Sequence, residues 1–299
     1  MNLSYLKLFN TLAEELSFSK AASLLYISQP AVSMQIKKLE EDLGLKLFER
    51  EGKHISLTDN GKILYQYTRK IFELVDEVDT ILCNKSDCIK GIVEIGASNA
   101  PGTYLLPGVI GEFKEIYTDV VVNLHISNTY EIERMVLDNK IDFAIIGGEE
   151  VVDGDVQVER LFEDELIFVC SPMNKLAALD YAERDDLVDM KFVVHEKNSR
   201  LYNLIDKILH ELQLPSNIVM TLGHIDAIKQ AVELDLGISA IPASTVKVEL
   251  KHGLLRQVKL RDKSWHYPYN LVFSNNRHHS TASKKLLEMV RERMKRTTL

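Results

Sequence analysis

The sequence lacks the features that mark several protein classes. Its three cysteines, Cys83, Cys88 and Cys170, are odd in number, and their spacing matches no zinc motif. We therefore expect reduced thiols in a cytoplasmic protein. No apolar run approaches the roughly 20 residues that span a bilayer. The N-terminus has no basic stretch followed by an apolar run, so we expect neither a membrane partner nor a secretory signal.

Sequence motifs of common enzyme classes are also missing. We find no P-loop, no nucleophile elbow and no metal-ligand spacing, and residues 96–102 lack the GxGxxG pattern of dinucleotide sites. We therefore expect no catalytic residues, no metal and no cofactor. The formal net charge of −8 counts against a surface that binds any polyanion.

What is present is an ordinary globular composition, with 45% hydrophobic and 27% charged residues. The 299 residues leave room for about two domains. The sequence changes character twice, which divides it into residues 1–58, 59–88 and 89–299.

Residues 1–57 carry short helical patterns joined by tight connections. Apolar residues from Leu3 to Ala13 recur every three or four positions, as on one face of a helix. Ser17 can cap a second helix. Ser28 can cap a third, with Pro30 in its first turn and Gly44 ending it. Two helices joined by a tight turn predict a helix-turn-helix.

The third helix has one apolar and one polar side. Val32, Ile36, Leu39 and Leu43 share the side that must face the core. The first turn on the other side can reach bases, and its lysines can reach phosphates. The residues expected to contact promoter DNA there are Ser28, Gln29, Pro30, Ala31, Ser33, Met34, Lys37 and Lys38. In the hairpin or wing that follows, Arg50 and Lys53 flank Gly52 and add two further contacts.

Residues 58–83 predict one long helix, capped by Thr58. Its apolar residues repeat in heptads, which is typical of a coiled-coil seam between two chains. The predicted dimerisation residues are Leu64, Tyr67, Ile71, Leu74, Val78 and Ile81. A helix packed on its own domain is the alternative.

After Gly91, short strands alternate with helices, which predicts a parallel α/β architecture. Expected strands include 92–97, 120–126, 141–146, 166–170 and 269–273. A helix is expected over 104–117, and the last helix over about 280–294.

Several segments of the N-terminal zone together resemble the LysR-type transcriptional regulators. They are SFSKAA (17–22), SQPAVSMQI (28–36), residues 39–40 and 43–44, LFER (47–50), residues 57–58 and Gly61. The three-zone layout agrees with that family over the whole chain. One departure is Met34, where many members have Arg, and a thymine methyl is a possible partner for it.

The resemblance implies a fold and an assembly. The fold is α/β with an N-terminal all-α winged helix-turn-helix, a long linker helix, and a C-terminal two-lobed, periplasmic-binding-protein-like (type 2) effector domain. Lobe I would hold about 89–164 plus 267–299, and lobe II about 165–266. The implied partners are a homodimer that assembles into a homotetramer, promoter DNA of dyad symmetry, RNA polymerase and a small-molecule co-inducer.

Two α/β lobes place a ligand at the ends of strands, facing helix N-termini, which suit an anion. The resemblance places effector contacts at Ser98, Asn128 and Thr129. The serine and asparagine at such connections can also be simple helix caps. The same strand-end segments and the second lobe supply the remaining candidates, which are Asn99, Thr103, Gly147, His195, Ser199 and His224. Two imidazoles facing an anion would bind it in a pH-dependent way.

We therefore expect a DNA-binding transcriptional regulator of the LysR type that senses a small, anionic metabolite. The alternative is a solute-binding or enzymatic α/β domain whose N-terminal helices only dimerise. The acidity does not oppose DNA binding, because seven basic and seven acidic residues balance within 1–57. The whole formal net charge of −8 therefore comes from residues 58–299.

Overall fold

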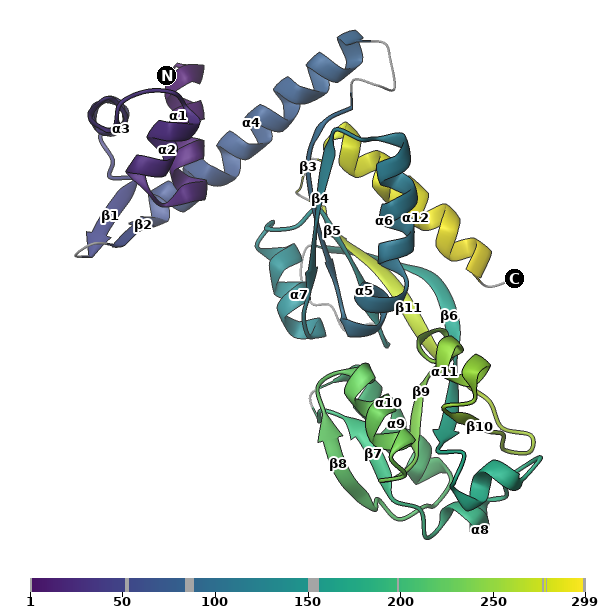
Figure 1. Ribbon diagram of the computed structural model, residues 1–299. Coiled ribbons are helices and arrows are strands. Elements are labelled where there is room, and N and C mark those ends of the chain that lie inside the picture. Colours follow the sequence, from purple (N-terminus) through teal and green to yellow (C-terminus); the bar gives the residue numbers. More distant parts are fainter. Residues whose placement is uncertain are drawn as a thin grey trace. The chain divides into compact units, whose positions relative to one another are not determined.

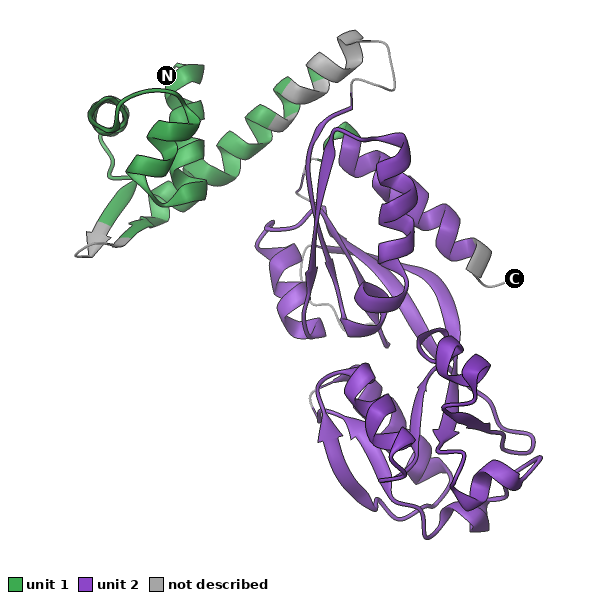
Figure 2. Cartoon of the chain, viewed as in Figure 1, with its two compact units in different colours: residues 1–88, 278–281 green, residues 89–277, 282–299 purple. Residues whose placement is uncertain are grey.

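The computed structural model describes residues 2–51, 54–83, 89–149, 156–197, 199–275, 277 and 279–297. The chain divides into two compact units, coloured separately in Figure 2. Unit 1 holds residues 1–88 and 278–281, and unit 2 holds 89–277 and 282–299. Each unit is described by itself below.

Unit 1 is a helical cluster followed by a hairpin and a long helix (Figure 1). Its elements are α1 (Leu3–Glu15), α2 (Phe18–Leu24), α3 (Gln29–Leu43), β1 (Phe48–Glu51), β2 (His54–Leu57) and α4 (Asp59–Cys83). The predicted caps are present: Ser17 accepts from the amide of Lys20, and Ser28 from that of Ala31. Gly44 ends α3 in the left-handed conformation, at φ 67°. The antiparallel pairing of β1 with β2 confirms the predicted hairpin.

Two residues fix the hairpin against the helices of unit 1. Glu40 is buried at the end of α3, where its Oε1 accepts the backbone amides of Leu47 (2.9 Å) and Phe48 (3.3 Å). Gly61 lies so close to Leu47 that an added Cβ would stand 2.1 Å from the Leu47 carbonyl oxygen. The chain therefore needs glycine where α4 starts.

Lobe I of unit 2 is a sheet covered by helices on both faces. Three parallel strands, β3 (Gly91–Ala97), β4 (Val120–Ile126) and β5 (Phe143–Gly147), pair in the order β4-β3-β5. The helices are α5 (Asn99–Tyr104), α6 (Leu106–Ile116), α7 (Thr129–Leu137) and α12 (Thr281–Thr297). Apolar residues of α6 and α12 share one core cluster with β3, whereas those of α7 share another with β5.

Lobe II is a second, smaller α/β unit. Its strands are β7 (Phe192–His195), β8 (Ile218–Leu222), β9 (Ser239–Pro242) and β10 (Arg256–Val258). Its helices are α8 (Arg184–Leu187), α9 (Arg200–Glu211), α10 (Ile225–Glu233) and α11 (Lys247–His252), with 3-10 turns at Lys175–Ala178 and Ala243–Thr245. β7 and β8 are parallel, while β9 and β10 both pair antiparallel with β6.

Two long strands join the lobes, β6 (Val156–Cys170) and β11 (Trp265–Ser274). They run antiparallel beside one another, and β11 also pairs with β5 of lobe I. The expected lobe boundaries fall at facing positions, because Asp164 is paired with Tyr267 and Glu165 with His266. Both lobes therefore share one ladder of strands.

The structure corrects three sequence-based element assignments. The helix expected over 104–117 is α6, which starts at Leu106 with Pro107 in its first turn, and a separate helix that was not expected, α5, precedes it and ends at Tyr104. Strand β6 starts at Val156, ten residues before the expected 166, and β11 starts at Trp265 instead of 269. The short elements α8, α11 and β10 were not expected.

Candidate DNA-reading and effector-binding sites

Helix α3 presents the polar side that its sequence predicts. Val32, Ile36 and Leu39 are buried in the unit 1 core. On the other side Ser28, Gln29, Pro30, Lys37 and Lys38 are exposed, Ala31 and Ser33 are half-buried, and the Met34 side chain is 68% exposed. The unit therefore leaves the first turns of α3 accessible to a nucleic acid.

Charged side chains of α3 and the hairpin have different surroundings. Lys37 forms an exposed ion pair with Glu41 (3.7 Å), which costs little to break. Burial alone would raise the pKa of Glu40, but its bonds to Lys46, Leu47 and Phe48 outweigh burial and hold the pKa below its usual value. Lys53 and the side chain of Arg50 lie outside the described residues, so their predicted contacts stay predictions.

The start of helix α4 and the part that follows have different surroundings. Near its start, Leu64 packs partly buried against the unit 1 core, and the buried Thr68 hydroxyl donates to Asn10 of α1 (3.0 Å). Leu64 therefore packs on its own domain, in line with the alternative interpretation for this part of the helix. Farther along, Tyr67, Leu74 and Val78 are 61%, 49% and 53% exposed, and Ile71 is half-buried. The side chain of Ile81 lies outside the described residues.

A cavity of about 340 Å³ lies between the two lobes of unit 2. Seven of the nine predicted effector residues line it: Ser98, Asn99, Asn128, Thr129, His195, Ser199 and His224. Four of these are the residues at which helices begin, since Ser98, Asn128, Ser199 and His224 precede α5, α7, α9 and α10. Helix N-termini from both lobes therefore converge on one cavity.

The two other predicted residues have different positions. Thr103 is exposed on α5, outside the cavity lining. Gly147 is buried behind the lining, where its amide donates to the Ser98 hydroxyl (3.0 Å). An added Cβ on Gly147 would stand 2.4 Å from Cε1 of Tyr267, which itself lines the cavity. Gly147 thus makes room for a cavity residue without lining the cavity.

The two histidines of the cavity, His195 and His224, have different surroundings. His195 is 7% exposed, and burial lowers its pKa, with His224 adding to the effect and Glu196 opposing it. His224 is in contact with the other lobe, because the Asn99 side chain donates to its Nδ1 (2.7 Å). The same asparagine accepts from the amide of Ile225 (3.3 Å) and so caps α10 from across the cleft.

Sequence reasoning missed the main cation of the cavity. Arg200, the first residue of α9, lines the cavity and forms an ion pair with Glu133 of α7 in the other lobe. Both side chains are about 15% exposed. Burial raises the pKa of Glu133, and Arg200 opposes that rise. The position of Arg200, directly after the cap Ser199, is the signal that could have revealed it.

Two negative findings concern the part of the chain that the structure describes. It contains no group of three or more His, Cys, Asp or Glu side chains placed to hold a metal ion. Its helices are all too short or too polar to cross a bilayer.

Comparison with known proteins settles the family. Residues 3–62 match the bacterial regulatory helix-turn-helix protein model of the lysR family, and residues 88–295 match the LysR substrate binding domain. The chain belongs to the LysR family of transcriptional regulators. Members of this LysR family bind promoter DNA and small-molecule effectors, so the chain is a regulator with an effector-binding domain.

Full-length relatives agree with this assignment. A probable RuBisCO transcriptional regulator from Cyanophora paradoxa is 32% identical over 294 residues, which cover 97% of this chain and 91% of the relative. One from Chlorokybus atmophyticus is 35% identical over 288 residues, covering 95% and 92%.

Solved structures share the fold of this LysR-family chain. A full-length OxyR variant from Pseudomonas aeruginosa has a TM-score of 0.72 at 21% identity, covering 98% of this chain and 94% of OxyR. Full-length BenM has a TM-score of 0.58 at 26% identity, covering 98% and 96%. The effector-binding domain of QuiR, in complex with shikimate, has a TM-score of 0.62 at 22% identity, covering 71% of this chain and all of that domain.

Proposed function

We propose that this LysR-type regulator senses a small anionic metabolite in the cavity between its lobes, and has no catalytic role. The convergence of helix N-termini carries the proposal. Helices α7, α9 and α10 each span nine or more residues and begin at the cavity, so the positive ends of their dipoles favour negative charge there.

Of the two charged side chains that line the cavity among the described residues, Arg200 supports the same ligand charge and Glu196 opposes it. The guanidinium of Arg200 lines the cavity and places a positive charge there, which favours a carboxylate ligand. Shikimate, the ligand named in the QuiR structure, is a carboxylate, which agrees with this chemistry. A volume of about 340 Å³ lies near the lower end of ligand pockets, so the effector would be small.

At the DNA end, we propose that two copies pair through α4 and place two α3 helices on a dyad-symmetric promoter site. The exposed apolar side chains of Tyr67, Leu74 and Val78 supply the pairing surface. Two such dimers would assemble into a tetramer. The protein would act in the same cellular compartment as its promoter DNA. There it would affect transcription by RNA polymerase.

A two-part experiment tests these proposals. Thermal stabilisation of the full-length protein is followed with sulfate, phosphate, shikimate and short mono- and dicarboxylates, and then with neutral analogues of the acids. We expect at least one anion to stabilise the protein more than its neutral analogue. Equal stabilisation, or none by any anion, would contradict the anionic effector.

The second part is a gel-shift assay on the DNA upstream of the protein's own gene. We expect a shift that an active anion alters, because ligand and DNA binding are linked. A folded dimer that fails to bind this DNA and neighbouring promoters at low salt would contradict the proposed mode of DNA binding.

A further inference from the structure

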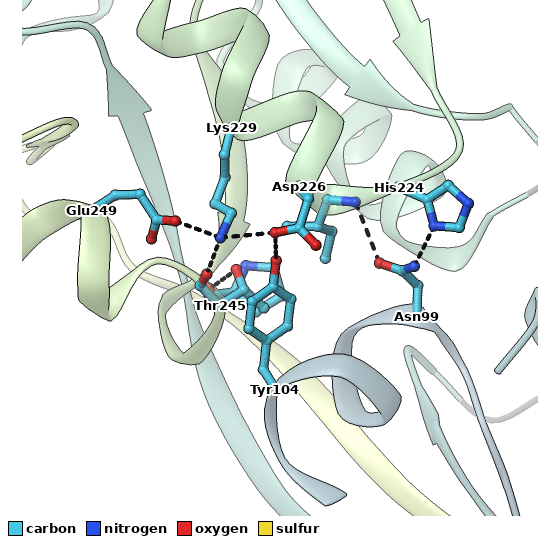
Figure 3. Close-up of polar contacts among 9 residues, drawn as sticks. Asn99, Tyr104, His224, Asp226, Lys229, Thr245 and Glu249 are labelled. Carbon is cyan, nitrogen blue, oxygen red and sulfur yellow. Dashed lines mark hydrogen bonds and ion pairs between the residues drawn. The ribbon is translucent and has the colours of Figure 1, made fainter. Parts of the chain in front are cut away.

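The two lobes make a second contact beside the cavity, between α5 of lobe I and α10 of lobe II (Figure 3). At the first residue of α5, Asn99 bonds His224 and the amide of Ile225. At the last residue of α5, the Tyr104 hydroxyl donates to Oδ1 of Asp226 (2.5 Å). Both ends of this short helix are therefore joined to the first turn of α10.

A buried lysine reinforces the contact at Tyr104. The side chain of Lys229 is 7% exposed, and its Nζ lies 4.7 Å from the centre of the Tyr104 ring. Lobe II groups hold this ammonium in place: Glu249 Oε1 at 2.6 Å, Asp226 Oδ1 at 3.1 Å and the Thr245 carbonyl oxygen at 3.1 Å. The ring of a lobe I residue thus covers a fixed cation of lobe II, an arrangement that gains strength when desolvated.

The protonation states of this contact are stable around neutral pH. Burial and the bond to Asp226 raise the pKa of Tyr104 to about 12, so the phenol remains a donor. Burial would lower the pKa of Lys229, but its bonds to Glu249, Tyr104 and Asp226 raise it above the usual value. The bond from Tyr104 to Asp226 and the charge of Lys229 therefore persist throughout the pH range in which histidines titrate.

We infer that Tyr104 is a positioning residue for effector binding: it fixes α5 to α10, and thereby holds Asn99 against His224 and the N-terminus of α10. Asn99, His224 and Ile225 all line the cavity, so the cavity wall is complete only while the two helices stay together. For its role in sensing, the inference rests on the proposed function. The apparent affinity for the ligand would equal the intrinsic affinity multiplied by the fraction of molecules in which this contact is closed.

The test is hydrogen exchange of the full-length protein without DNA or anion. Tyr104→Phe removes the hydroxyl and keeps the ring, whereas Tyr104→Leu removes both. We expect the Ile225 amide to exchange about tenfold faster in Tyr104→Phe, the effect of one hydrogen bond to a charged acceptor near solvent. The increase should be larger in Tyr104→Leu.

Tyr181→Phe is the matched control, because Tyr181 also carries a cation over its ring, Arg261 at 5.8 Å, but both residues belong to lobe II. It should leave exchange at Ile225 unchanged. Unchanged exchange at Ile225 in Tyr104→Phe would overturn the inference. An increase spread evenly over unit 2 would also overturn it, since it would reveal general destabilisation.

The result is separable from that of the anion titration, because neither anion nor DNA is present. If no anion binds and Ile225 is still deprotected in Tyr104→Phe, the positioning role stands and the anionic effector fails. If an anion binds and exchange is unchanged, only the positioning role fails.

Discussion

At the scale of single residues, Arg200 is the cation best placed to hold an anionic effector. We expect Arg200→Gln to weaken binding of the anion found by titration by roughly tenfold or more, the value of a charge-assisted hydrogen bond. Calorimetric titration measures the affinity. Because this change leaves Glu133 half-buried without its arginine, the double variant Arg200→Gln with Glu133→Gln should be compared with it.

The control for that titration is Arg134→Gln. Arg134 lies on α7, one residue after Glu133, and its side chain is 71% exposed. It carries the same charge as Arg200 but does not line the cavity. Equal losses of affinity in Arg134→Gln and Arg200→Gln would show that overall charge, and not contact with the ligand, determines the binding.

His195 provides a pH dependence of stability. Burial lowers its folded-state pKa, so below the unfolded value of about 6.5 the unfolded chain binds more protons than the folded protein. Its contribution to stability is therefore present above pH 6.5 and is lost as the pH falls through the folded pKa. We expect the melting temperature of His195→Gln to drop less between pH 7 and 5 than that of the wild type.

His252→Gln, which removes an exposed imidazole of α11, is the control for this comparison. Identical pH profiles for the wild type and His195→Gln would mean that burial of His195 carries no penalty on protonation. Calorimetry without added anions is the measurement, because a bound ligand would itself shift the titration.

Residue positions could be predicted from sequence where local spacing determines them. Ser98, Asn128 and Ser199 follow strands and precede helices, so their place at the cavity follows from the order of elements. Arg200 was missed because its direction depends on Glu133, 67 positions earlier in the chain. Glu40 is the first of three consecutive acids in the sequence, and only the fold shows that it accepts the amides of the hairpin.

At the scale of elements, Gly61 determines how α4 joins the helix-turn-helix. We expect Gly61→Ala to destabilise unit 1 by roughly 2–3 kcal/mol, because its Cβ would overlap the Leu47 carbonyl. Calorimetry measures the change. Gly111→Ala in α6 is the control, since nothing lies within 4 Å of its added Cβ and a helix gains about 0.5–1 kcal/mol from alanine. Equal effects of the two changes would contradict the packing described for Gly61.

A charged substitution tests whether two chains pair through α4. Leu74→Glu should dissociate the dimer and abolish binding to a dyad site, because the buried carboxylates would have no partner. Sedimentation gives the oligomeric state, and a gel shift the DNA affinity. Gln66→Glu, an exposed change on the same helix, should preserve both. A Leu74→Glu protein that remains dimeric would show that the chains pair elsewhere.

Elements were predictable from sequence where one face is buried throughout. Helix α3 matches its apolar spacing and its caps, from Ser28 to Gly44. The first ten residues of β6 were not recognised because only two of them, Leu161 and Phe162, are buried and five carry a charge. They are strand because β11 pairs with them, which is a contact across more than one hundred residues. The local pattern of apolar and polar residues does not show that a distant strand will pair with this segment.

At the scale of the whole molecule, charge is divided between the regions. Residues 1–57 are neutral overall, whereas 58–299 carry the net −8. DNA affinity should therefore come from a few local contacts. We expect the slope of log affinity against log salt to lose about 0.9 for each phosphate contact removed by Lys37→Gln. Fluorescence anisotropy measures the slope, and Lys251→Gln, on α11, should not change it.

The shared ladder of β6 and β11 gives the chain a modular organisation. Chain entry into lobe II and exit from it are neighbours, since Asp164 faces Tyr267 across paired strands. Paired antiparallel residues lie about 5 Å apart, a gap that a two-residue turn can close. Lobe II is thus one continuous insertion, and a single recombination event could graft a different half-sensor between these two points. The transplant would leave the order of the lobe I strands intact.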